Sequence, residues 1–230
     1  MSNYLFLFLE PHDAHRHTFS QWRCDLLPAH LFSPTTHTLY LDATESTAAT
    51  TRSADANADS DAQGPALTTY NHLNIYRFSP ATTAPQAPAR DLELALQSLS
   101  SATQPNRIIS YQWTTYTTIS ETHPPSVSPP APTIVTVGMT VPLTDSAARD
   151  TLDRWYADEH IPALAGVPGW QEGTKRGNAT APFLAVHQWD EPNGLGGEVW
   201  RAACATPSTK MIEEMQVAPM QRRVWRPCLE

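Results

Sequence analysis

The sequence predicts an α+β protein built from two consecutive β-α-β-β-α-β units, and three observations indicate it. Runs of β-branched and aromatic residues alternate with runs whose apolar residues recur at helical spacing, and this order occurs twice. A proline-rich segment of limited flexibility, residues 122–132, separates the two series. Segments of the second series also match segments of the first, which suggests a tandem duplication.

The first unit covers residues 1–121. Alternating apolar residues indicate its strands, and leucines or aromatic residues three or four positions apart indicate its helices. The expected elements are a strand at 3–10, a helix at 13–31, strands at 36–42 and 70–79, a helix at 90–102 and a strand at 107–119. Residues 43–66 contain no bulky apolar side chain, so we expect a flexible insertion there.

The second unit covers residues 133–230, and its central helix starts near a capping residue, Thr144 or Asp145. The residue before a proline avoids helical angles, so Ile161 and Pro162 are expected to end this helix. The other expected elements are a strand at 133–143, strands at 170–177 and 183–190, a helix at 198–215 broken near Pro207, and a strand at 221–228.

The third strands of the two units can be aligned without gaps. FLAVHQWD at 183–190 matches HLNIYRFS at 72–79, so that His187 pairs with Tyr76. Successive side chains of a strand point to opposite faces. We expect Leu73, Ile75, Leu184 and Val186 to face the helices. The alternate set, which includes His72, Tyr76 and His187, is then expected to point between two packed sheets and to line a small-molecule cavity.

Bulk composition excludes several classes of function. The net charge of −8 argues against nucleic acid or an anionic membrane as the main partner. No apolar run is long enough to span a membrane, and the run at 4–9 is too short for a signal peptide. Three cysteines without CxxC spacing are typical of free thiols in a reducing compartment, so a cytoplasmic location is expected.

The central helix carries the strongest candidate for chemistry. Glu159 and His160 lie in its last predicted turn, and Tyr156 shares a face with His160 because it lies four residues earlier. Trp155 lies on the neighbouring strip and is expected to contact the substrate. A histidine at a helix C-terminus meets the negative end of the dipole, which favours its charged form. His160 could therefore act as an acid or base in an aromatic setting, or it could simply cap the helix.

Further candidates are weighed against plainer roles. His187, Tyr76 and His72 are expected on the cavity face, unless a slip of one residue turns them away. Trp113, on the long strand, could stack on an aromatic substrate or belong to the core, and Glu159 could orient a histidine or be solvated. The HDAHRH segment at 12–17 could bind a metal, but a solvated helix start is expected and no metal site is predicted.

The segments WYADEHIPALAGVPGW, FLAVHQWDEP and EVWRAACATPSTKMIEEM, at 155–170, 183–192 and 198–215, resemble the dimeric α+β barrel superfamily, in particular the EthD-like proteins of fungi. The resemblance implies two ferredoxin-like units packed sheet to sheet as an intrachain dimeric α+β barrel. It also implies that His160 is the recurrent site histidine. Leu26 or Leu27 stands at the matching position of the first half, so we expect one competent pocket, in the second half.

These observations predict an enzyme without a cofactor. The expected reaction is a cyclisation, isomerisation or decarboxylation of a hydrophobic, polyketide-like or aromatic carbonyl compound, with His160 as general acid or base and Tyr156 assisting. The alternatives are a non-catalytic small-molecule-binding or accessory protein and a haem- or oxygen-dependent monooxygenase. The protein is expected to be a monomer with an intrachain pseudo-dimer, or a homodimer.

Overall fold

The computed structural model describes residues 3–11, 19, 38–43, 71–78, 109–121, 131–142, 144–177 and 183–227. The strands are β1 (Asn3–Pro11), β2 (Thr38–Ala43), β3 (His72–Phe78), β4 (Ile109–Glu121), β5 (Thr133–Met139), β6 (Trp170–Gly177), β7 (Phe183–Trp189) and β8 (Gln221–Pro227). The helical segments are α4 (Ser146–Arg154), the π-helical turn η6 (Trp155–His160), α5 (Ile161–Ala165), α6 (Glu198–Cys204) and α7 (Pro207–Met215).

The eight strands form a closed barrel in the order β1-β3-β2-β8-β5-β7-β6-β4. Each half contributes four antiparallel strands in the same internal order, β4-β1-β3-β2 and β8-β5-β7-β6. The halves meet where β2 pairs with β8 and where β4 pairs with β6, so neither sheet keeps a free edge. The predicted antiparallel α+β fold is confirmed.

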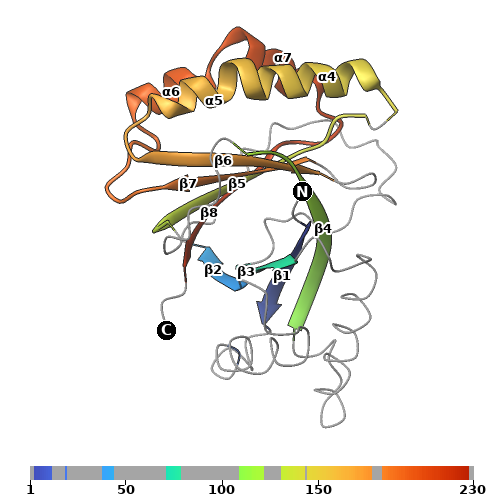
Figure 1. Ribbon diagram of the computed structural model, residues 1–230, viewed down its shortest axis with the longest axis vertical. Coiled ribbons are helices and arrows are strands. Elements are labelled where there is room, and N and C mark those ends of the chain that lie inside the picture. Colours follow the sequence, from blue (N-terminus) through green and yellow to red (C-terminus); the bar gives the residue numbers. More distant parts are fainter. Residues whose placement is uncertain are drawn as a thin grey trace.

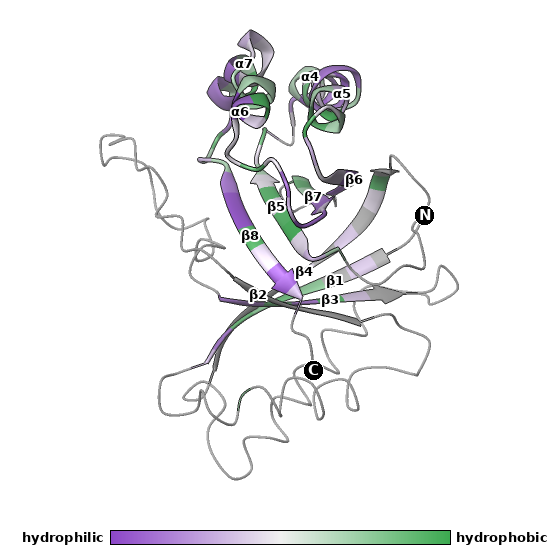
Figure 2. Ribbon diagram, turned by 90° about the vertical axis from the view of Figure 1, so that its left-hand side faces the viewer, coloured by the Kyte–Doolittle hydropathy of each residue, from purple (hydrophilic) through white to green (hydrophobic). Residues whose placement is uncertain are grey.

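Helices α4 to α7 form a layer over the outer face of β5 to β8, and both views place this layer on the side away from β1 to β4 (Figures 1 and 2). No helix in the described part of the chain is both long and apolar enough to cross a bilayer. The helices expected at 13–31 and 90–102 lie outside the described residues, apart from Phe19. The insertion expected at 43–66 also lies outside the described residues, apart from Ala43. So does the linker at 122–132, apart from residues 131 and 132.

The predicted orientation of the third strands was wrong. Leu73 and Ile75 form one buried cluster with Leu184 and Val186, together with residues of β1, β5 and β8, so all four side chains lie inside the barrel. Phe183 and its alternate neighbours pack instead against the helices. Both faces of these strands are largely buried, so alternation defines two faces without indicating which one faces the helices.

The central helix continues past the proline that was expected to end it. Asp145 caps α4, accepting a hydrogen bond from the backbone N–H of Ala148 at 3.0 Å, as one of the two predicted caps. The π-turn η6 then links α4 to α5, and the N–H of Ile161 bonds to the carbonyl of Tyr156. Pro162 lacks an N–H, and its ring would clash with the carbonyl four residues earlier in an α-helix. The wider π-turn accommodates it.

The last helical region breaks where expected, because α6 ends at Cys204 and α7 begins at Pro207. Thr206 caps α7 by accepting a hydrogen bond from the N–H of Thr209 at 3.1 Å. Proline at the first helical position needs no donor, so Thr206 and Pro207 together define the helix start.

Candidate functional site

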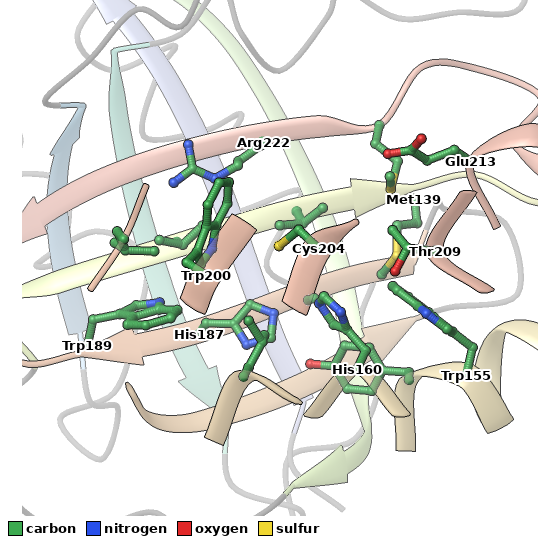
Figure 3. Close-up of a pocket in the computed structure, with 17 residues that line it drawn as sticks. Met139, Trp155, His160, His187, Trp189, Trp200, Cys204, Thr209, Glu213 and Arg222 are labelled. Atoms are coloured by element: carbon green, nitrogen blue, oxygen red, sulfur yellow. The ribbon is translucent and has the colours of Figure 1, made fainter. Parts of the chain in front are cut away.

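A cavity of about 190 Å³ lies between the helical layer and the outer face of the second half's sheet (Figure 3). It is on the helical side of the sheet, and not between the two sheets as predicted. The sheet contributes Val135, Val137, Met139, Ala185, His187, Trp189 and Arg222, and the helices and connecting segments contribute Trp155, Tyr156, His160, Leu164, Leu195, Trp200, Cys204, Thr209, Glu213 and Met220. Most of these side chains are apolar or aromatic, as in typical small-molecule sites.

The π-turn η6 determines how the helix presents its functional side chains. The rings of Trp155 and His160 stack with centroids 4.4 Å apart and planes 25° apart. These residues are five positions apart, and in a regular α-helix their directions would differ by about 140°. The wider turn brings them onto one face together with Tyr156, whose ring centroid lies 6.0 Å from that of His160.

His187 reaches the same place from strand β7. Its ring centroid lies 6.0 Å from that of Tyr156 and 6.1 Å from that of His160. The sheet makes room for the imidazole at Gly173 of β6, where an added Cβ would lie only 2.9 Å from Nδ1 of His187. The structure thus brings His187 together with the predicted site residues Tyr156 and His160. His187 reaches this place because its side chain lies on the face of β7 that packs against the helices.

Both histidines are neutral at neutral pH. Burial lowers the pKa of His160 to about 4, against a smaller opposing effect of Glu159. Burial lowers the pKa of His187 to about 3, and the nearby His160 and Arg222 lower it further. The expectation that a helix dipole favours charged His160 was wrong, because the helix continues to Ala165 and desolvation dominates. Burial likewise raises the pKa of Tyr156, which stays a phenol.

Five buried polar atoms around the cavity have no hydrogen-bond partner within the described residues. They are Nε1 of Trp155, Oη of Tyr156, Nδ1 of His160, Nδ1 of His187 and Nε1 of Trp189. Buried polar groups are normally paired, because an unpaired group has lost its water without compensation. Their gathering at one apolar cavity is what a site for a ligand with several polar groups requires.

Glu159 does not line the cavity. The hydroxyl of Thr206 donates a hydrogen bond to its carboxylate, and Thr206 is also the N-cap of α7. Hydrogen bonds from Ser208 and Thr206 hold the pKa of Glu159 below its ordinary value. Glu159 therefore connects η6 to the start of α7, which fixes the helical wall that carries His160.

The first-half candidates lie away from this cavity. Tyr76 is buried on β3 and accepts a hydrogen bond from Asn74, and the ring of His72 lies 4.7 Å from that of Phe19. Trp113 pairs with Leu7 through the backbone, and its side chain lies outside the described residues. The HDAHRH segment is also outside them, and the described residues contain no cluster of three metal-ligating side chains.

Several cavity residues were missed by sequence reasoning. Trp189 follows His187 by two positions on one strand and therefore shares its face. Trp200 and Cys204 are four apart on α6 and share a helix face. Arg222 lies with its guanidinium 5.2 Å from the ring centroid of Trp200. A charged residue in a terminal strand gave no signal that it faces a cavity.

Comparison with known proteins supports the fold and goes no further. No family model matches the chain, and no curated protein matches it in sequence. A candidate monooxygenase from Fusobacterium nucleatum subsp. nucleatum has a TM-score of 0.51 and 10% identity, covering 98% of this chain and 91% of its own. A candidate chlorite dismutase, TA0507, also has a TM-score of 0.51 and 10% identity, covering 99% and 95%. At such identities the likeness shows a shared fold.

Proposed function

We propose that this chain is an enzyme acting on a small aromatic carbonyl compound, that His160 removes a proton from the substrate, and that molecular oxygen is the co-substrate. The observation that carries the proposal is a set of five buried polar atoms around one apolar cavity, which have no hydrogen-bond partner among the residues that the structure describes. A planar substrate with several oxygen atoms would pair with these groups while its ring contacts the aromatic walls.

The protonation states favour a base at His160 and a hydrogen-bond donor at Tyr156. Neutral His160 can accept a proton from a carbon next to a carbonyl, and the phenol of Tyr156 can donate a hydrogen bond to the oxygen of the resulting enolate. The depressed pKa of His160 belongs to the cavity without substrate. An enolate formed beside the ring would stabilise the imidazolium and raise that pKa.

Oxygen is proposed as the co-substrate because a solved protein of the same fold is described as a candidate monooxygenase. In a balanced reaction, a CH₂ group next to the carbonyl loses two hydrogens and gains one oxygen atom, and the second oxygen atom leaves as water. A haem does not fit the cavity, since about 190 Å³ is small even for drug-sized ligands, which occupy about 300–1,000 Å³. We therefore propose no step through a haem.

The test measures oxygen consumption and product mass with hydroxylated aromatic ketones and 1,3-diketones. We expect oxygen uptake, a product with one more oxygen and two fewer hydrogens, and loss of turnover in His160→Gln. Asp158→Asn is the matched control, because Asp158 is exposed on the same π-turn. Turnover without oxygen uptake would instead favour cyclisation, isomerisation or decarboxylation by the same proton transfer. Binding with no turnover in the wild type would favour the non-catalytic alternative.

A further inference from the structure

We propose that the cavity binds its ligand as an aromatic carboxylate and that Arg222, on β8, holds the carboxylate group. This inference rests on the proposed function, because it names the substrate class of the same cavity. It adds a residue that sequence reasoning did not select, and it assigns the two ends of the cavity different tasks.

The charges around the cavity favour an anion. Among the described residues that line it, Glu213 is the acidic side chain and Arg222 the basic one, and both histidines are neutral. Glu213 is exposed to solvent, whereas Arg222 is half-buried. A guanidinium stays protonated in any protein environment. Arg222 therefore adds a positively charged group to the wall of the cavity.

The guanidinium of Arg222 is also held in a defined place. It lies over the ring of Trp200, 5.2 Å from the centroid, and such stacking orients the planar group. Figure 3 shows Arg222 and Trp200 on one side of His187, whereas His160 lies on its other side. His160 and Arg222 both lower the pKa of His187, which agrees with the position of His187 between them.

This order of groups defines how a ligand lies. A guanidinium can bind a carboxylate through two parallel hydrogen bonds, so the carboxylate is expected at Arg222. The aromatic ring then passes His187, and the far end of the ligand reaches His160 and Tyr156, where the proton is removed. A cavity of about 150 Å³ is known to hold benzene, so about 190 Å³ suits a single substituted ring.

The experiment compares benzoate with benzamide, which have nearly the same shape and differ in charge. Binding to the intact chain is followed by tryptophan fluorescence, since Trp155, Trp189 and Trp200 line the cavity. We expect benzoate to bind about 10-fold more tightly than benzamide or better, as for hydrogen bonds to charged groups. Arg222→Met should remove this preference. Arg226→Met is the control, because Arg226 is exposed on the same strand and pairs with Glu191.

Equal affinity of the wild type for benzoate and benzamide would overturn the proposal, and so would a preference that persists in Arg222→Met. If Arg222→Met does not fold, Arg222→Gln keeps a planar polar group without the charge and must lose the preference. His160→Gln should keep the preference for benzoate while losing turnover. The two proposals therefore fail separately: the preference tests Arg222, and turnover tests His160.

Discussion

Replacing Gly173 by alanine tests whether His187 is held as the structure shows. An added Cβ would lie 2.7 Å from Cδ1 of Ile161 and 2.9 Å from Nδ1 of His187. The end of an isoleucine side chain can rotate away at little cost. The imidazole is packed against the strand, and the space open to it is the cavity. We therefore expect Gly173→Ala to push the ring of His187 into the cavity.

The size of the effect follows from two opposing contributions. Forcing an extra methyl into a packed site costs about 1–3 kcal/mol. Replacing glycine by alanine within a strand recovers about 0.5–1 kcal/mol. We expect a net loss of about 1 kcal/mol, which lowers the Tm of a chain of this length by about 2–4 °C. Benzoate should bind more weakly, because the displaced ring takes up cavity volume.

The assay pairs thermal unfolding with benzoate titration, and Gly166→Ala is the control. At Gly166 an added Cβ would meet only the carbonyl of Ala163, at 3.5 Å, and φ is −81°. That variant should match or slightly exceed the wild type in Tm, since alanine restricts the unfolded chain. If Gly173→Ala is as stable as Gly166→Ala and binds benzoate like the wild type, the packing of His187 against Gly173 is refuted.

Tyr156→Phe removes a buried hydroxyl that has no hydrogen-bond partner in the described part of the chain. The free energy of unfolding should therefore stay level or rise by about 1 kcal/mol, while kcat falls on the order of 100-fold. A clear loss of stability would show that the hydroxyl is paired. Thr206→Ala removes the cap of α7 and should cost about 1 kcal/mol in urea unfolding, whereas Thr151→Ala, on the outside of α4, should cost nothing. Because the pKa values of His160 and His187 are about 4 and 3 in the folded chain, against 6.5 when unfolded, the unfolded chain binds more protons below pH 6.5. Stability should therefore fall from about pH 6.5 toward pH 4, and His187→Gln should show a shallower fall; parallel curves would contradict the buried neutral state.

The helical part of the site was predictable because helical spacing acts over short distances in the chain. Tyr156 and His160 were chosen as residues four apart on one face, and the structure places both at the cavity. The π-turn could not be read from the sequence, since it depends on how Pro162 is accommodated. It matters for Trp155, which was expected beside Glu159 and instead stacks on His160.

The sheet was predictable in its strands and their order, but its faces were not. A strand with apolar side chains on one face and polar side chains on the other reveals which face is buried. In β7 both sides are buried, with Leu184 and Val186 in the barrel and Phe183 and Ala185 under the helices. Which face lies in the barrel and which lies under the helices depends on the layers that pack against the strand. Those layers come from distant parts of the chain. The predicted location of the cavity was therefore wrong, although His187 does line the cavity that the structure shows.

The helical side of the second half holds the cavity, and the barrel interior holds a packed cluster of large side chains. Phe6, Phe8 and Trp225 occupy the interior, and the guanidinium of Arg176 packs over the rings of Tyr4 and Phe6, 3.7 Å and 5.3 Å from their centroids. The candidate ligand site of this chain therefore lies beneath the helices. Imidazole, phenol and guanidinium groups converge there, and the arrangement requires one sheet and one helical layer from the same half of the chain.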